Sequence, residues 1–321
     1  GGCMTETDQP EDVTGNVTYE ERIDLRALSR NLWQGKWLLG ALATAGLAIA
    51  VVIALLLPNI YRAEALLAPS KQQSVGGIAS LAGQYAGLAS LPGIGLAGAT
   101  TDDAAFGLET LKSRGFISDF ISRHGILVPL MAAKGWDRST RQLILDANIF
   151  DVASDSWVRD ASPPREVVPS VQEASERFRD EVLSVSQDKE TGFVTIAVEH
   201  YSPDIAKQWV DWLVHDINAT IMERDVHEAE QAIAYLEEQI AATPLSELQN
   251  VFFGLIEEQT KTVMLANVSP EYLFRTIDPA VVPELKTKPR RAWMAFLGLV
   301  LGAGLGVITV LVRARMANEY R

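Results

Sequence analysis

Two long apolar runs without a single charged residue limit what this chain can fold into. They cover residues 37–57 and 292–312, each 21 residues long. About 20 apolar residues, rising 1.5 Å each in a helix, cross a hydrocarbon layer about 30 Å thick. Trp37 and Trp293 stand at or near the start of each run, a position typical of membrane-interface anchors. The runs therefore predict a protein that crosses a membrane twice.

Basic residues predict the orientation of the first run. Only two follow it closely, whereas four precede it: Arg22, Arg26, Arg30 and Lys36. Positive charge collects on the cytoplasmic side of a membrane. Basic residues lie on both sides of the second run, so only the first run indicates the orientation of the chain in the membrane. We predict cytoplasmic tails at 1–36 and 313–321, with residues 58–291 as a domain on the far side.

The segment between the two runs is acidic. From Tyr61 to Arg291 it holds 21 Lys and Arg against 33 Asp and Glu, which accounts for nearly all of the net charge of −13. A field of this sign repels phosphate backbones, so we expect no nucleic-acid partner. The single cysteine, Cys3, excludes a disulfide within the chain.

Hydrophobic patterning between the runs predicts a mixed α+β fold. We expect strands at 61–68, 193–199 and 272–278, helices at 103–125, 171–182, 203–242 and 245–266, and a loop at 75–99. The first and last strands each adjoin a membrane run along the chain. We therefore expect them to pair in one small membrane-proximal sheet.

The helix expected at 203–242 is unusually long. Ser202 and Pro203 form a helix-start signal, no proline or glycine interrupts the segment after Pro203, and Pro244 ends it. Forty helical residues extend about 60 Å. With the helix at 245–266, the segment predicts a long helical hairpin that projects from the domain.

No motif predicts a catalytic, cofactor or metal site. The glycines at 93–98 match G-x-G-x-x-G, but no strand precedes them. Asp211 and His215 lie one helical turn apart, without a second cluster to complete a metal site. The acidic pair Glu257 and Glu258 fits a solvated helix face. We expect no catalytic residue, no cofactor and no metal.

Two sets of residues near the second run are candidates for packing or interaction. Three prolines stiffen the connector into the run, and three glycines at four-residue spacing share one face of the predicted helix. The candidates are Pro279, Pro283 and Pro289, followed by Gly298, Gly302 and Gly306. Contact with a partner protein and simple packing within the chain both fit this pattern.

Taken in order along the chain, these features resemble the Wzz-type chain-length determinants, the class 1 polysaccharide co-polymerases of bacterial inner membranes. The segments that carry the resemblance include 23–25 (IDL), 108–116 (LETLKSRGF), 255–261 (LIEEQTK), 264–267 (MLAN) and 272–274 (YLF), besides the prolines and glycines above. The resemblance implies a periplasmic central domain and a ring of identical subunits. It also implies control of the modal length of a polysaccharide, such as O-antigen or a related exopolysaccharide. A Wzy-type polymerase would assemble that polymer on undecaprenyl diphosphate.

Two other functions remain open. The first is a co-polymerase of a capsule or exopolysaccharide export system, which usually carries a longer coiled coil or a tyrosine-rich tail. Here nine residues follow the second run, with Tyr320 as their only tyrosine, and we expect no kinase domain there. The second is a sensor, or an enzyme subunit whose catalytic partner is another chain.

Overall fold

The computed structural model describes residues 33, 35–70, 103–242 and 246–319. The chain divides into two compact units, Gly1–Leu56 with Arg291–Arg321, and Leu57–Arg290. We call them the helix-pair unit and the central unit. The loop expected at 75–99 lies outside the described residues.

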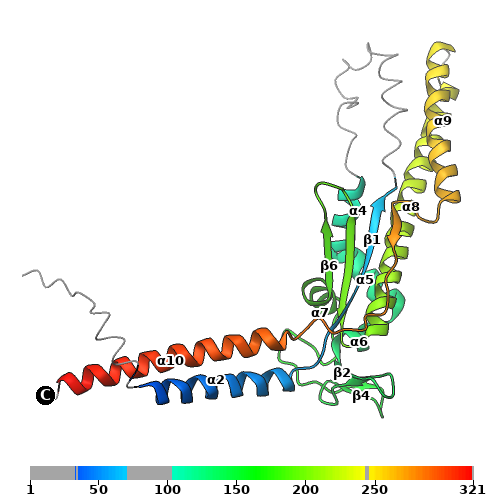
Figure 1. Ribbon diagram of the computed structural model, residues 1–321. Helices are drawn as coiled ribbons and strands as arrows, with labels where there is room; N and C mark the ends of the chain where they lie inside the picture. Colours follow the sequence, from blue (N-terminus) through cyan, green and yellow to red (C-terminus); the bar gives the residue numbers. More distant parts are fainter. Residues whose placement is uncertain (1–32, 34, 71–102, 243–245, 320–321) are drawn as a thin grey trace, which may run out of the picture. The chain divides into compact units, whose positions relative to one another are not determined.

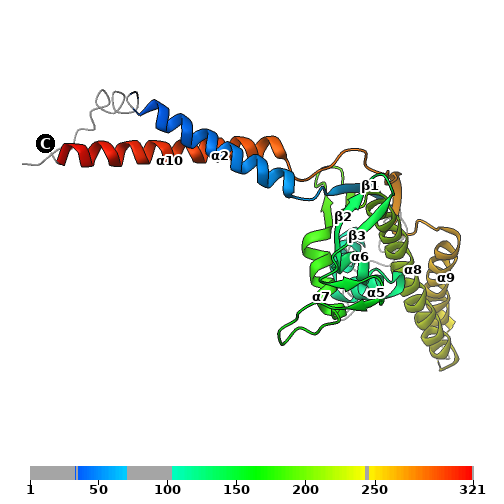
Figure 2. The same ribbon diagram turned by 90° about the horizontal axis from the view of Figure 1, so that it is seen from below.

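The helix-pair unit consists of α2 (Lys36–Leu56) and α10 (Arg291–Glu319), which lie side by side (Figures 1 and 2). Both are long and apolar enough to span a membrane, over Lys36–Leu56 and Arg291–Arg313. Only 6% and 17% of the residues in their most apolar windows are buried. An apolar helix that the protein leaves exposed on most sides suits lipid rather than water.

A four-stranded antiparallel sheet, in the order β6–β7–β1–β8, forms the base of the central unit. Its strands are β1 (Tyr61–Pro69), β6 (Leu183–Gln187), β7 (Val194–His200) and β8 (Phe274–Asp278). β1 lies between β7 and β8, with Ala63 opposite Val198 and Ala68 opposite Arg275. The predicted pairing of the first and last strands is confirmed, as is the α+β class.

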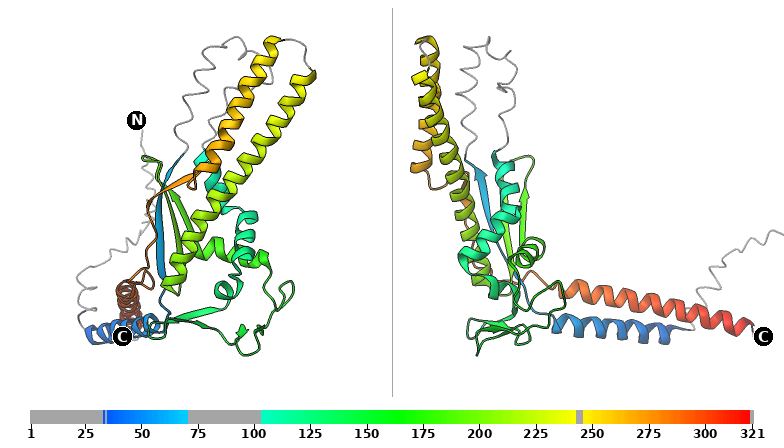
Figure 3. Two further views of the ribbon diagram at one scale, coloured as in Figure 1. Left: turned by 90° about the vertical axis from the view of Figure 1, so that its right-hand side faces the viewer. Right: turned by 180° about the vertical axis from the view of Figure 1, so that it is seen from behind.

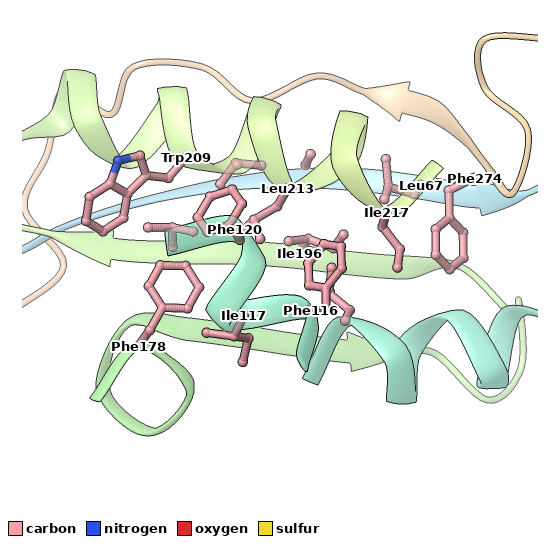
Figure 4. Packing of buried hydrophobic residues seen from close by; sticks show 14 of the residues in the cluster. Leu67, Phe116, Ile117, Phe120, Phe178, Ile196, Trp209, Leu213, Ile217 and Phe274 are labelled. Carbon is pink, nitrogen blue, oxygen red and sulfur yellow. The ribbon is translucent and has the colours of Figure 1, made fainter. Parts of the chain in front are cut away.

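The core lies on one face of this sheet. Burial alternates along β1, where Tyr61, Ala63, Ala65 and Leu67 are buried, as expected of a sheet with one solvated face. Helices α5 (Arg114–His124), α7 (Val171–Arg177) and α8 (Pro203–Ala242) supply most of the remaining core. Figure 4 shows side chains of α5 and α8 meeting those of the strands.

The helix expected at 103–125 is two helices, so the prediction of a single one is wrong. α4 (Asp103–Lys112) ends before Ser113, and α5 begins after it. Ser113 is the N-cap of α5: its Oγ accepts a hydrogen bond from the Phe116 N–H at 3.2 Å. A serine at this position satisfies a backbone donor that the new helix leaves free.

Helix α8 covers the range that the sequence pattern predicts, and α9 (Ser246–Val268) follows it. The two helices form a hairpin that extends beyond the sheet (Figure 3). Half-buried or buried residues of α9 recur every three or four positions along the face turned to α8: Gln249, Phe252, Ile256, Gln259, Val263 and Ala266. This spacing is typical of antiparallel helix packing.

Several short elements were not predicted. They are the hairpin β2 (Ala133–Asp137) with β3 (Gln142–Leu145), the hairpin β4 (Phe150–Asp151) with β5 (Ser156–Trp157), α6 (Leu127–Met131) and strand β6. The helix expected at 171–182 begins as α7 and ends as a π-helical turn, Phe178–Val182. Phe178 of this turn is fully buried in the core.

Candidate functional site

The two long helices of the helix-pair unit touch through glycine. A Cβ atom built on Gly302 would lie 2.5 Å from the carbonyl oxygen of Leu42, and one on Gly46 would lie 2.6 Å from that of Gly298. Real Cβ contacts are essentially never this short. Glycine therefore allows the two backbones to approach, as small residues do between membrane helices.

All three predicted glycines of α10 lie against α2. Gly298 meets the Ala50 side chain, and a Cβ on Gly306 would lie 3.2 Å from the Cα of Leu39. Gly304, off the row, would meet nothing within 4 Å. The structure thus places the glycine row at a contact within the chain. A role of the row in binding another protein stays a prediction.

The proline-rich connector, residues 279–290, lies against the start of β1 within the central unit. The Ile60 N–H donates to the Lys288 carbonyl oxygen at 3.0 Å, and the Thr287 N–H donates to the Ile60 carbonyl oxygen at 2.9 Å. Ala280 is buried in the core. The three predicted prolines differ in exposure, since Pro279 is exposed whereas Pro283 and Pro289 are half-buried. They shape this connector, and their contact with a partner stays a prediction.

Asn218 fixes α8 to the chain that enters β8. Its side chain is buried, and its amide forms four hydrogen bonds. Oδ1 accepts from the N–H groups of Leu273 and Phe274, each at 2.8 Å. Nδ2 donates to the carbonyl oxygens of Val214 at 3.0 Å and Phe274 at 3.1 Å. The base of the hairpin is therefore held by the Asn218 amide, a buried polar group whose oxygen and nitrogen are both hydrogen-bonded.

His200 holds the start of α8. Its Nδ1 accepts from the Ser202 N–H at 3.0 Å, so Nε2 carries the proton and donates to the Pro129 carbonyl oxygen at 3.1 Å. Burial lowers the pKa of His200 to about 4, although its two backbone hydrogen bonds act in the opposite direction. The imidazole is therefore neutral at pH 7.

A polar cluster joins α5 to α8. His124 Nε2 donates to Asp216 Oδ2 at 2.9 Å, and Arg123 Nη1 lies 3.4 Å from the same oxygen. The imidazole stacks on the Trp212 indole, with the ring centroids 4.2 Å apart. The Asp216 side chain is 5% exposed, so this carboxylate lies inside the protein. The sequence pattern did not predict this cluster. Its one local sign is Asp216, a lone aspartate within the apolar stripe of Leu213 and Ile217.

The hairpin carries apolar side chains on its outer surface. On α9, exposed apolar residues form two rows: Val251, Leu255 and Leu265 in the first, and Phe253, Met264 and Val268 in the second. At about 100° per residue, the rows lie roughly 130° apart around the helix axis. Exposed apolar groups in such rows typically mark a surface that meets another protein.

In the described part of the chain, no three His, Cys, Asp or Glu side chains gather in a way that could hold a metal ion. Asp211, considered above with His215, instead pairs with Lys207 at 2.5 Å on the same helix. Glu257 and Glu258 are adjacent on α9. The absence of a catalytic or metal-binding site stays a prediction.

The chain thus has two candidate membrane helices, one on either side of a central α+β unit with a projecting hairpin. Residues 21–124 match the family model described as "Wzz: Chain length determinant protein". The match includes α2, β1, α4 and α5. The resemblance to Wzz-type chain-length determinants is confirmed over this segment, about a third of the chain, and supports a role in polysaccharide chain length. It also fits an inner-membrane protein.

Among solved structures, the chain is similar to a "full-length bacterial polysaccharide co-polymerase", with 13% identity and a TM-score of 0.38 over 92% of this chain and 99% of that one. It is also similar to a fragment of WzzB, a polysaccharide co-polymerase from Salmonella Typhimurium. That match has 10% identity and a TM-score of 0.27, over 72% of this chain and 100% of that one. Both TM-scores are below 0.5, so these two likenesses add nothing to the match over residues 21–124. No curated protein matches this chain significantly.

Proposed function

We propose that this chain is a non-catalytic, oligomeric scaffold of the bacterial inner membrane that sets the modal length of a polysaccharide. The polymer would be lipopolysaccharide O-antigen or a related exopolysaccharide, assembled on undecaprenyl diphosphate by a Wzy-type polymerase. Both termini would lie in the cytoplasm, and the central unit in the periplasm, because basic residues precede the first span.

The observation that carries the proposal is the family match over residues 21–124. This segment contains the first candidate span and the central strand of the sheet, β1. The match thus includes both the membrane helix and the start of the domain that it anchors. The family is named for chain-length determination.

The surface of α9 supports a ring of identical subunits. Its two apolar rows face different directions, so one row of a first copy could pack against the other row of a second copy. Contacts between two different patches are heterologous, and repeated heterologous contacts close into a ring when the rotation allows it. Burying both rows in this way would also remove them from water.

The proposal is tested by the length distribution of surface polysaccharide, separated on a gel, in a strain that lacks the gene and in the same strain with the gene restored. We expect deletion to replace a modal cluster by a random ladder, and restoration to bring the cluster back. Complete loss of polymer after deletion would instead support an export component. An unchanged distribution would show that the proposal is wrong.

A further inference from the structure

The central unit has one end from which both candidate spans continue. The unit covers residues Leu57–Arg290, directly between the two spans. Within it, Ile60 pairs with Lys288, and this pair lies four residues or fewer along the chain from each span. Because an extended chain covers at most about 3.6 Å per residue, the pair is within about 15 Å of both spans. In a chain that crosses a membrane twice, this end of the unit therefore lies beside the bilayer.

The β2–β3 hairpin is held at the same end by Arg138. Its Nη2 donates to the carbonyl oxygen of Glu284, in the proline-rich connector, at 2.9 Å. Its guanidinium carbon also lies 5.9 Å from the centre of the Tyr61 ring, at the start of β1. Figure 1 agrees with these contacts, since β2 lies at the end of the central unit opposite α9. We call the hairpin, residues 133–145, together with residues 284–290, the basal surface.

The basal surface is positively charged on an acidic unit. Its two segments hold two acidic residues and six basic ones: Lys134, Arg138, Arg141, Lys286, Lys288 and Arg290. Their net charge is +4, whereas the whole segment between the membrane runs carries −12. Three carboxylates from elsewhere in the unit pair with these basic residues, and counting them leaves +1: Asp146, Asp204 and Glu199. The excess of negative charge therefore lies away from this surface, which favours contact with anionic headgroups.

Arg141 has a backbone conformation that glycine or asparagine adopts more easily. Its φ is 53°, in the left-handed region, where an arginine is strained. Its side chain is exposed, and an exposed ion pair such as the one it forms with Asp204 at 3.3 Å stabilises a fold little. An arginine that gains so little within the chain indicates a use for its guanidinium outside it. Guanidinium groups match the geometry of phosphate well.

Leu285 adds an apolar side chain to the basal surface. It is 83% exposed and follows Glu284, whose carbonyl oxygen binds Arg138. It lies six residues before Arg291, and hence within about 22 Å of the second span. Basic side chains beside exposed apolar ones are typical of surfaces that lie in the headgroup layer of a membrane.

We propose that the basal surface docks on the bilayer and binds the phosphate groups of anionic phospholipids. Arg138 and Arg141 contact the phosphates, and Leu285 enters the headgroup layer. Arg138 keeps its contact with Glu284, which uses one of the five N–H groups of a guanidinium. The inference rests on the two membrane spans of the function proposed above, and not on control of chain length. Docking would hold the central unit in one orientation on the membrane.

The test uses the full chain in lipid nanodiscs, made either of phosphatidylcholine alone or of phosphatidylcholine and phosphatidylglycerol in equal amounts. Cys3→Ser removes the single cysteine, and Gln142→Cys then places a fluorophore beside Arg141. Nitroxide groups on the lipid headgroups quench the fluorophore when it lies at the bilayer surface. Lys189→Cys gives the matched control label, in the exposed turn between β6 and β7 at the other end of the sheet.

We expect about twofold more quenching of the label at position 142 in the anionic nanodiscs than in the neutral ones. The label at position 189 should show no such difference. Salt should abolish the extra quenching, because it screens exposed charges. The proposal is wrong if the label at position 142 is quenched equally in both nanodiscs.

Arg141→Gly separates docking from folding. It removes one charge and relieves the left-handed backbone, so the melting temperature should not fall. Docking should weaken about fivefold, the attraction of roughly one basic residue, so the extra quenching should be lost at a lower salt concentration. Arg275→Gln, at an exposed position of β8 near the other end of β1, removes the same charge and should change nothing. Equal salt dependence of Arg141→Gly and the unaltered chain would overturn the proposal.

A second copy of the chain is the alternative occupant of the basal surface. Contact between copies would shield the label at position 142 from the lipid nitroxides. It would also bring two labels together, so that fully labelled chains quench themselves in either lipid. That result would overturn the proposal.

The outcome is separable from that of the proposed function. If no docking is found but the restored gene still sets a modal length, only the docking assignment is wrong. If the label reports docking but deletion leaves the polysaccharide unchanged, the chain-length function is wrong and the docking surface stands.

Discussion

Asn218 and Phe274 are joined by two hydrogen bonds in opposite directions: the Phe274 N–H donates to Asn218 Oδ1 at 2.8 Å, and Asn218 Nδ2 donates to the Phe274 carbonyl oxygen at 3.1 Å. One residue is on the long helix α8, and the other begins the strand β8. The pair therefore connects the hairpin to the edge strand of the sheet.

Substitution Asn218→Ala should destabilise the central unit strongly. The buried N–H groups of Leu273 and Phe274 would lose their acceptor, at about 1–3 kcal/mol each. Including the lost donor, we expect a total of about 3–5 kcal/mol and a drop in melting temperature of roughly 10 °C. Thermal unfolding of the purified chain measures this. Asn267→Ala on exposed α9 is the control and should change the melting temperature little. Equal effects of the two substitutions would contradict this account of the hairpin base.

The glycine contact between the membrane helices predicts a position-specific effect. Gly302→Leu places a side chain against the backbone of Leu42, so it should cost about 1–3 kcal/mol or force the helices apart. Gly304→Leu adds the same side chain where nothing lies within 4 Å, and should be tolerated. Disulfide cross-linking between cysteines introduced on α2 and α10 reports the helix separation. Comparable cross-linking of both variants would argue against close glycine packing.

Acid should weaken the fold through His200. Its pKa in the folded chain is lowered to about 4, below the ordinary value of 6.5. As the pH falls below 6.5, the unfolded chain takes up a proton that the folded chain does not, so stability is lost progressively down to about pH 4. At pH 5 the loss from this group is about 2 kcal/mol relative to pH 7.5.

This pH effect is measured by chemical denaturation of the unaltered chain and of His200→Gln at several pH values. Glutamine can still accept the hydrogen bond from Ser202 but does not titrate. The variant should be less stable at pH 7.5 and lose less stability on acidification. An identical acid slope for both chains would rule out His200 as the source.

The two apolar rows of α9 predict how the chain assembles. Phe253→Asp places a charge in one row and should lower the mass of the detergent-solubilised oligomer, because burying an unpaired charge at an interface is costly. Lys261→Gln makes the same change in net charge at an exposed position between the rows and should leave the oligomer intact. Light scattering coupled to size-exclusion chromatography distinguishes the two. An oligomer of Phe253→Asp with unaltered mass would exclude this row from the interface.

The sequence predicts the long elements of this fold better than the short ones. Helix α8 could be delimited because a serine–proline start and a following proline bound a segment without internal breakers. The strand β6 could not, because LSVSQ has only two apolar residues, too few to establish a period, and follows a helix directly. The small hairpins β2–β3 and β4–β5 are too short to show a period.

Only part of the candidate site could be predicted from the sequence. Spacing alone placed Gly298, Gly302 and Gly306 on one helical face, but Gly46 opposite them could not be identified among the small residues of the first run. The contact of His124 with Asp216 joins residues 92 positions apart. It depends on how α5 packs against α8, which no local pattern specifies.

One gel tests whether an assembled scaffold sets polysaccharide length. A deletion strain receives an empty plasmid, the unaltered gene, the Phe253→Asp gene or the Lys261→Gln gene, with equal protein levels confirmed. We expect a modal cluster with the unaltered and Lys261→Gln chains, and a random ladder with the empty plasmid and with Phe253→Asp. If the unaltered gene gives the same length distribution as the empty plasmid, the claim is contradicted.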